Sequence, residues 1–355
     1  MAAYPFVSII MPIRNEAAYI RRSLGAVLAQ DYPAEQMEVL VVDGMSSDGT
    51  RELVLRMAGE QESPAVYLLD NPAHIVPTAL NIGLQHARGD IIIRVDGHCE
   101  IAPDYVRLCV ETLTETGADN VGGVWDTIGE TPVARTISVA QSSPFGIGNV
   151  AYRTQRQSPG FVDTVPFGAY RRRVFDRIGG FDERLVRHQD YELNTRIRQS
   201  GGRIYYTPSI RARYYSRSSF RALARQYWQY GFWKAFVTLE NPGALAWRHL
   251  APIGLAGAAI GGALPSIFMP QVRVLYFCIL ALYILASLAM ALKEARRAGW
   301  KHLPLLPAAF ATIHLCWGAG FWWGILSRLP SLAARLGRGG RPVAGTPRPN
   351  PRNEE

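Results

Sequence analysis

Cysteine is scarce in this chain of 355 residues, which contains four. None of them forms a Cys-x-x-Cys pair, and Cys278 and Cys316 lie within apolar runs. The sequence therefore indicates neither a zinc site nor a disulfide framework, and a reducing cytosol suits the first part of the chain. The first residues also lack the basic start and long apolar core of a signal peptide, because Pro12 interrupts the apolar run. We therefore expect this end to stay in the cytosol.

Charge is absent from three long stretches near the C-terminus. Residues 250–269, 274–292 and 303–326 contain no Lys, Arg, Asp or Glu. At about 1.5 Å per helical residue, each stretch is long enough to cross about 30 Å of hydrocarbon. The alternative, a very apolar core helix, is weaker because a globular domain seldom buries three such stretches in a row. The sequence predicts three membrane segments.

The formal net charge of +9 is not spread evenly along the chain. Residues 293–355 hold ten Lys or Arg and three acids, so most of the surplus lies beside or after the apolar stretches. No motif of a nucleic-acid-binding module accompanies these cations. Basic clusters beside membrane segments usually face anionic lipid headgroups. We therefore expect membrane lipid, and no nucleic acid, as a partner.

Short apolar runs alternate with helical patterns through the first 126 residues. The spacing of apolar residues predicts helices at 17–30, 49–60, 75–87 and 103–116. The strand-like runs are FVSIIMPI, EVLVVD, AVYLLD, DIIIRVD and VGGVW. Such repetition predicts an α/β domain with a mostly parallel, twisted sheet covered on both faces. Functional residues are then expected where the strands end.

The run GDIII leads into RVDGHCE, so a buried strand ends in Asp96, Gly97 and His98. Two side chains with lone pairs flank a residue small enough for a ligand to approach the backbone. A metal or phosphate site at the carboxyl edge of the sheet is one interpretation. A hydrated turn is the other, since Asp-Gly is among the commonest turn dipeptides. These residues alone leave both interpretations open.

Six motifs stand in an order and approximate spacing that resemble one known family. They are VSIIMPIRNE, VVDGMSSDGT, ALNIGLQHARGD, RVDGH, GGFDE and HQDYELNTRIRQSGG. On these motifs the chain is similar, over about residues 5–240, to family 2 glycosyltransferases with the GT-A fold, and most of all to members that assemble exopolysaccharides. The resemblance implies a Rossmann-like GT-A domain at 1–216 and an amphipathic interfacial region at 217–249. Membrane-embedded helices at 250–329 and a basic, disordered tail at 330–355 complete the expected organisation.

The resemblance also implies roles for acidic residues. Asp96 matches the first acid of the family's DxD motif, and His98 stands where many relatives carry the second. Together they would anchor a divalent cation, Mn²⁺ or Mg²⁺, although Mg²⁺ prefers oxygen ligands and imidazole suits Mn²⁺. Asp190 matches the catalytic base on the acceptor side, and Gln189 replaces the usual glutamate beside it. A helix N-cap role for Asp190 is compatible with catalysis.

The same resemblance assigns two sets of binding residues. Those expected to bind the nucleotide sugar are Pro12, Arg14, Asn15, Glu16, Asp43 and Asp96. Those expected to bind the acceptor are Gly168, Arg171, Gln189 and Trp233. A carboxylate that accepts the imide N–H of a base favours uracil, so the expected donor is a UDP-sugar. Asp48 offers a helix N-cap and is expected to be structural.

The resemblance implies a membrane-bound inverting glycosyltransferase. It would move a sugar, glucose from UDP-glucose, to a polyprenyl-linked saccharide at the cytoplasmic membrane, as a multi-pass protein with its catalytic domain in the cytosol. A processive polysaccharide synthase is the nearest alternative, but its QxxRW motif is incomplete because Phe232 stands at the basic position. A catalytically inactive scaffold is another alternative, which the retention of Asp43, Asp96 and Asp190 disfavours.

The distribution of charge predicts how the apolar stretches sit in the membrane. A hairpin of the first two places the MPQVR loop outside and the basic KEARRAGWKH loop inside, as the positive-inside rule requires. A third crossing would carry the arginine-rich tail outside, against that rule. We therefore expect 303–326 to be a re-entrant or interfacial element, with the tail in the cytosol. With the aromatic helix around Tyr227 to Trp233, it would form a groove for a lipid acceptor.

Overall fold

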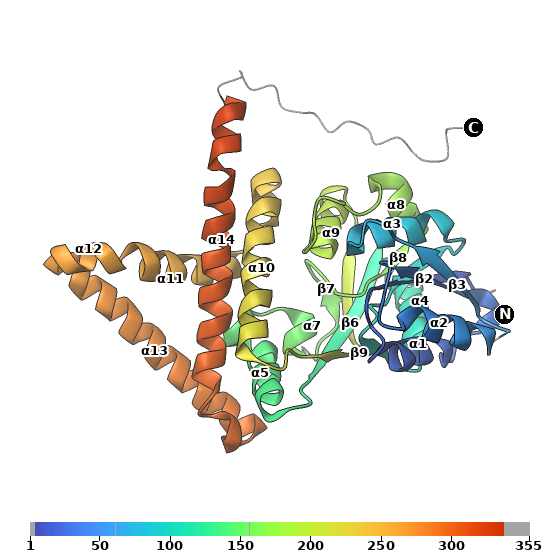
Figure 1. Cartoon of the computed structure of the whole chain (residues 1–355), viewed down its shortest axis with the longest axis horizontal. Coiled ribbons are helices and arrows are strands. Elements are labelled where there is room, and N and C mark those ends of the chain that lie inside the picture. The colour runs from blue at the N-terminus through green and yellow to red at the C-terminus, as the bar shows by residue number, and fades with distance from the viewer. Residues whose placement is uncertain (1–3, 61, 156, 337–355) are drawn as a thin grey trace.

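A mixed sheet of nine strands forms the centre of the N-terminal part of the described chain (Figure 1). The computed structural model describes residues 4–60, 62–155 and 157–336. Neighbouring strands follow the order β3-β2-β1-β4-β8-β6-β9-β5, and β7 pairs with β9. The strands are β1 (Val7–Ile13), β2 (Met37–Asp43), β3 (Ala65–Asp70), β4 (Ile91–Arg94), β5 (Cys99–Ile101), β6 (Asn120–Ile128), β7 (Gly160–Phe161), β8 (Ala169–Arg171) and β9 (Ile204–Tyr215).

Strands β1 to β4 pair in parallel and confirm the predicted α/β half of the sheet. Every residue of β1, β2 and β4 is buried, as expected of parallel strands covered on both faces. Successive side chains of β1 enter opposite cores, because Ile9 and Met11 join one apolar cluster and Ile10 joins the other. The first four helices of the chain agree with the predicted ones. They are α1 (Ile20–Leu28), α2 (Thr50–Gly59), α3 (Val76–His86) and α4 (Tyr105–Thr116).

The later strands make the sheet mixed. β8 lies antiparallel between β4 and β6, while β9 pairs in parallel with β6 and antiparallel with β5. Helix α9 begins at Gln189, so Asp190 lies in its first turn. The helices of this half are α5 (Pro132–Ser142), α6 (Pro144–Ile147), α7 (Ala151–Thr154), α8 (Arg172–Ile178) and α9 (Gln189–Gln199).

Helices α10 to α14 follow the sheet. They are α10 (Phe220–Glu240), α11 (Leu250–Gly261), α12 (Ala263–Phe268), α13 (Pro270–Ala298) and α14 (Leu306–Leu336). Short 3-10 turns are η1 (Ala34–Gln36), η2 (Pro242–Ala244), η3 (Trp247–His249) and η4 (Trp300–His302). α10 and α14 run side by side, α11 packs on α14 and leads away from it to α12, and α13 returns to the start of α14 (Figure 1). α14 extends into the predicted tail, of which residues 337–355 lie outside the described residues.

The first predicted membrane segment, residues 250–269, is not one continuous helix. α11 ends at Gly261 and α12 begins at Ala263, so the segment divides at a pair of glycines. Glycine has a low helix propensity, and Pro265 fits within the first turn of a new helix. Among the described helices, α13 and α14 are long and apolar enough to cross a membrane. Of the three predicted membrane segments, the second and third thus lie in single helices of sufficient length, and the first is divided between α11 and α12.

Helix α10 packs closely on α14 through glycines. A Cβ on Gly231 would lie 1.8 Å from the carbonyl oxygen of Trp317, and one on Gly320 would lie 2.2 Å from that of Trp228. Small residues spaced in this way let two helix backbones approach closely. In the apolar window of α14, 44% of the residues are buried, against 11% in α13. Protein therefore covers α14 to a greater extent than α13, which exposes most of its apolar surface.

Candidate active site

A cavity of about 610 Å³ opens between the sheet and the C-terminal helices. On the sheet side it is lined by Asp96 and His98, which follow β4, and by Asp190 of α9. On the far side it is lined by residues of α11, α13 and α14. One cavity thus joins the end of the parallel strands to the apolar helices.

Arg94 forms a two-pronged ion pair with Asp96 at the end of β4. Its Nε donates to Oδ1 at 2.8 Å and its Nη2 donates to Oδ2 at 3.1 Å. Arg94 is only 6% exposed. Burial alone would lower the pKa of this guanidinium, but the charges of Asp96 and Asp190 outweigh burial and raise that pKa. Arg94 therefore stays charged, within electrostatic reach of both carboxylates.

His98 is oriented by Glu16, which follows β1. The Nδ1 atom of His98 lies 2.9 Å from Oε1 of Glu16. Burial would lower the pKa of His98, but the hydrogen bond and charge of Glu16 outweigh burial and raise that pKa. Because Nδ1 faces Glu16, Nε2 is the nitrogen left for a ligand. Many metal sites hold a histidine between a carboxylate and the metal in this way.

Gly97 lets the loop between Asp96 and His98 pass close to β1. A Cβ at this position would lie 2.9 Å from Cγ2 of Ile13 and 3.0 Å from Cγ of Glu16. The loop is a turn, since the backbone N–H of Cys99 donates to the carbonyl oxygen of Asp96 at 3.0 Å. The loop therefore turns tightly and presents two polar side chains, those of Asp96 and His98, to the cavity.

Asp96 and His98 fit a divalent cation that takes further ligands from a substrate. Within the described ranges, no group of three or more His, Cys, Asp and Glu side chains could hold a metal ion by itself. One carboxylate and one imidazole suit Mn²⁺. Diphosphate oxygens are the usual completing ligands for cations held by few protein groups.

Helix α9 presents Asp190 from its first turn and is held there by His188. Oδ1 of Asp190 accepts from the backbone N–H of Tyr191 at 3.0 Å. Nε2 of His188 lies 2.8 Å from the carbonyl oxygen of Tyr230 in α10. Since a carbonyl oxygen can only accept, Nε2 carries the proton and donates. Burial and then the charge of Lys234 lower the pKa of His188 to about 3. A neutral His188 thus ties the start of α9 to α10.

The loops that follow β1 and β2 are tied to each other. The Asp43 carboxylate is fully buried and accepts from the Ser46 backbone N–H at 3.0 Å and from Nη1 of Arg51 at 2.7 Å. The backbone N–H of Asn15 donates to Oγ of Ser46 at 2.8 Å. Among the described residues, five of those expected to bind the nucleotide are not part of the cavity lining. They are Pro12, Arg14, Asn15, Glu16 and Asp43.

Asp48 joins the same two loops, in agreement with its expected structural role. Its Oδ2 accepts from the backbone N–H of Ala17 at 3.1 Å and its Oδ1 from that of Thr50 at 3.1 Å. The N-cap residue of α2 is Gly49, so Asp48 is not itself the cap.

Of the residues expected to bind the acceptor, Gln189 lines the cavity. The other three, Gly168, Arg171 and Trp233, lie outside the lining that the described residues form. Arg171 donates to backbone carbonyl oxygens within and after α4. Gly168 leaves no room for a Cβ beside Asn120, and Trp233 packs on aromatic rings of its own helix.

Several basic residues of the cavity were not predicted from the sequence, among them Arg153, Lys234 and Arg248. The Arg153 guanidinium lies 4.6 Å from the ring centroid of Trp125 and 5.1 Å from that of Tyr214. Lys234 carries a usable signal, because a lone lysine in an apolar, aromatic helix near membrane segments is a functional-site hypothesis by default. Nothing in the sequence distinguishes Arg153 and Arg248 from the other Lys and Arg residues, of which the chain has 38 in all.

Comparison with known proteins identifies the family. Residues 8–179 match the family described as Glycosyl transferase family 2. The succinoglycan biosynthesis protein ExoA of Rhizobium meliloti (strain 1021) is 32% identical over 321 residues, which cover 90% of this chain and 94% of ExoA. The chain belongs to glycosyltransferase family 2. The family expected from the six motifs is thereby confirmed.

Further comparisons place this glycosyltransferase among proteins that handle different sugars. A dolichyl N-acetyl-alpha-D-glucosaminyl phosphate 3-beta-D-2,3-diacetamido-2,3-dideoxy-beta-D-glucuronosyltransferase of Methanococcus voltae is 27% identical over 330 residues, covering 90% of this chain and 97% of the relative. The mannosyltransferase PcManGT from Pyrobaculum calidifontis, in complex with GDP-Man and Mn²⁺, is similar in structure, with a TM-score of 0.56 and 25% identity over 88% of each chain. The expected GT-A fold is confirmed.

Proposed function

We propose that this glycosyltransferase is membrane-bound and inverting, and that it moves a hexose from a nucleotide sugar to a lipid-linked saccharide for an exopolysaccharide or cell-surface glycan. One observation carries the proposal. A single cavity contains the Arg94–Asp96 pair, His98 and Asp190 at one end and residues of the apolar helices at the other. A soluble donor and a lipid-borne acceptor can therefore meet in it.

The proposed reaction is a single displacement at the anomeric carbon. The acceptor hydroxyl attacks that carbon, the bond from the carbon to the diphosphate oxygen breaks, and the hydroxyl proton passes to Asp190. General-base catalysis of this kind contributes about 10² to 10⁴ in rate. His188 positions the first turn of α9 and thereby the carboxylate of Asp190.

Asp96 and His98 would hold a divalent cation, Mn²⁺ or Mg²⁺. When bound, such an ion acts as a Lewis acid that stabilises the negative charge of the leaving diphosphate. Arg94 keeps the Asp96 carboxylate in place. Glu16 keeps the His98 ring in place through Nδ1, so that Nε2 of His98 would be available to the ion. The Mn²⁺ found with the mannosyltransferase PcManGT supports this assignment.

UDP-glucose is the proposed donor, on the resemblance to exopolysaccharide-assembling members of the family and the 32% identity to ExoA. A polyprenyl-linked saccharide is the proposed acceptor. The dolichyl phosphate named for the Methanococcus relative supports a lipid carrier of this class. Asp43 would contact the nucleotide through the loop that its carboxylate organises rather than from the cavity itself.

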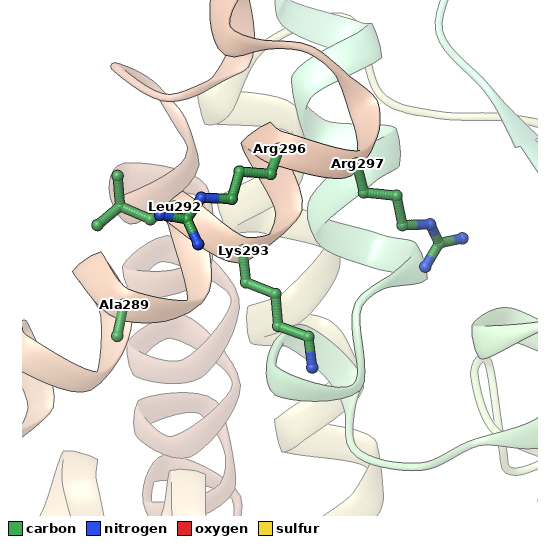
Figure 2. Close-up of a pocket in the computed structure, with 5 residues that line it drawn as sticks. All are labelled: Ala289, Leu292, Lys293, Arg296 and Arg297. Carbon is green, nitrogen blue, oxygen red and sulfur yellow. The ribbon is translucent and has the colours of Figure 1, made fainter.

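We further propose that α11, α12 and α13 enter the cytoplasmic membrane as a hairpin, while α14 lies at its inner surface beside α10. The 11% burial of α13 against 44% for α14 supports this arrangement. The exposed cations Lys293, Arg296 and Arg297 extend from the last turns of α13 (Figure 2). Such a cluster suits anionic headgroups on the cytosolic side. The catalytic domain and the tail would then both be cytosolic.

The test of the proposed function uses the full chain purified in detergent. It is incubated with UDP-glucose, other UDP-sugars or GDP-mannose and a membrane lipid extract, with Mn²⁺ or with EDTA. We expect transfer from a UDP-sugar to an organic-soluble lipid, seen as a hexose increment in mass, with an inverted anomeric centre by NMR. Turnover of no donor, or a product with retained configuration, would contradict the proposal.

A further inference from the structure

Lys234 is a buried lysine whose amine makes no hydrogen bond with the described residues. It lies in α10, its side chain is 1% exposed, and its Nζ makes no hydrogen bond in that part of the chain. Its Nζ lies over the face of an aromatic ring, 3.2 Å from the ring centroid of Tyr191. An unpaired ammonium is costly to bury. The residue nevertheless belongs to the lining of the cavity.

The surroundings of Lys234 are positive. Burial and then the charge of Arg248 lower the pKa of Lys234, and Arg198 adds to the effect. The charge of Asp163 raises that pKa, but the Asp163 carboxylate already accepts from Nη2 of Arg248 at 2.5 Å. The charges that act on Lys234 are thus those of two arginines and of one carboxylate that is already paired. An anion is the chemical group that this arrangement lacks.

The cluster lies between the candidate reaction centre and the apolar helices. Tyr191, which the ammonium contacts, follows Asp190 directly in α9. The ring centroid of His249 lies 6.2 Å from that of Tyr191. The His249 ring also stacks on Trp317 of α14, with 5.5 Å between the ring centroids. Beyond these rings the cavity wall is apolar. It includes Ala251, Pro252 and Leu255 of α11 and Ile313 of α14.

We propose that Lys234, with Arg248 beside it, binds the phosphate of a polyprenyl-phosphate carrier while the polyprenyl chain lies against α11 and α14. The inference rests on the proposed lipid-linked acceptor and adds the site that selects it. A phosphate supplies the charge-assisted hydrogen bonds that the ammonium lacks. The contacts lead from Tyr191, beside Asp190, to Lys234 and through His249 to Trp317 of α14, which matches the order of saccharide, phosphate and chain in such a carrier.

The test measures binding of farnesyl phosphate and of farnesol to the full chain in detergent, in the absence of donor. Wild type is expected to bind farnesyl phosphate at least about tenfold more tightly than farnesol. Lys234→Met is expected to lose that preference, and Lys234→Arg to retain most of it. Lys301→Met, which removes an exposed lysine, is the matched control and is expected to retain it in full. An unchanged preference in Lys234→Met would overturn the proposal.

Three competitors identify the source of the phosphate. Inorganic phosphate, phosphatidylglycerol and UDP are each titrated against bound farnesyl phosphate. We expect each to displace it at least about tenfold less well than unlabelled farnesyl phosphate. If phosphatidylglycerol displaces it equally well, the site binds a membrane headgroup. If inorganic phosphate does so, the site binds a free anion, and if UDP does so, the site binds the donor. Each of these results would overturn the proposal.

The thermal midpoint separates a binding role from a structural one. Because Lys234 is buried and unpaired, Lys234→Met without ligand is expected to be at least as stable as wild type. Lys234→Gln gives a second measurement of the binding preference if the methionine variant does not fold. Loss of the preference only in variants that are less stable would overturn the proposal. If the protein transfers no sugar but still prefers farnesyl phosphate in a manner that depends on Lys234, the proposed function is contradicted and the phosphate site is not.

Discussion

Arg94 and Asp96 form a bidentate pair across the end of β4, with Nε to Oδ1 at 2.8 Å and Nη2 to Oδ2 at 3.1 Å. The pair fixes the direction of the Asp96 carboxylate before any ligand arrives. Nη1 of Arg94 is buried and makes no hydrogen bond within the described residues. Arg94 therefore has one more donor to offer to an anionic group in the cavity that it lines.

We expect Arg94→Lys to lower transfer by about 10-fold to 100-fold at saturating Mn²⁺. An ammonium cannot hold both carboxylate oxygens in one plane, and small displacements of catalytic groups are costly. The measurement is kcat with UDP-glucose across a Mn²⁺ titration. Arg107→Lys, in an exposed pair with Asp31, is the control and should behave as wild type. Wild-type kcat in Arg94→Lys would show that the pair is only structural.

Asp96→Ala is expected to abolish metal-dependent transfer, whereas His98→Asp should leave an active enzyme that prefers Mg²⁺ relative to wild type. The substitution at His98 keeps a ligand but replaces nitrogen with oxygen, which Mg²⁺ favours. Initial rates with Mn²⁺, Mg²⁺ and EDTA measure both effects. If His98→Ala matches wild type with every metal, His98 serves only the turn.

Gly231→Ala is expected to destabilise the helix pair α10–α14. Its Cβ would lie 1.8 Å from the carbonyl oxygen of Trp317, so the helices must separate, at a cost of about 1–3 kcal/mol or more. The thermal midpoint in detergent should fall. Gly254→Ala in α11 is the matched control, because nothing lies within 4 Å of its added Cβ. An equal midpoint for both variants would contradict the proposed close packing.

The parallel half of the sheet could be predicted because each strand is a short apolar run that ends in recognisable polar residues. Runs such as EVLVVD give β2 directly, and the helices between them show regular apolar spacing. β8 and β5 could not be predicted in the same way, since each has three residues and owes its pairing to distant strands. Short strands carry too little periodicity to detect.

The candidate site was predictable only in part. Asp96, His98 and Asp190 stand in motifs, and the structure brings them to one cavity. The pairing of Glu16 with His98 joins residues 82 positions apart, which no local pattern reveals. The break at Gly261 was readable in principle from the glycine pair, but apolar composition alone favoured one long helix.

Membrane topology is testable by cysteine labelling in intact cells with an impermeant maleimide. We expect Gln271→Cys, at the start of α13, to be labelled from outside. Lys301→Cys and Thr346→Cys should be labelled only after permeabilisation, because the basic end of α13 and the tail are expected in the cytosol. Labelling of Thr346→Cys in intact cells would establish a third crossing and contradict the hairpin arrangement.

The central claim is that the cavity performs inverting transfer with Asp190 as the base, and Asp190→Asn tests it most directly. The variant keeps the shape of the side chain and removes the proton acceptor. We predict that kcat falls by at least about 10²-fold while UDP affinity stays within about twofold of wild type. Asp176→Asn, on an exposed carboxylate of α8, is the control and should keep full activity. Near-normal kcat in Asp190→Asn would remove Asp190 from the mechanism and contradict the account.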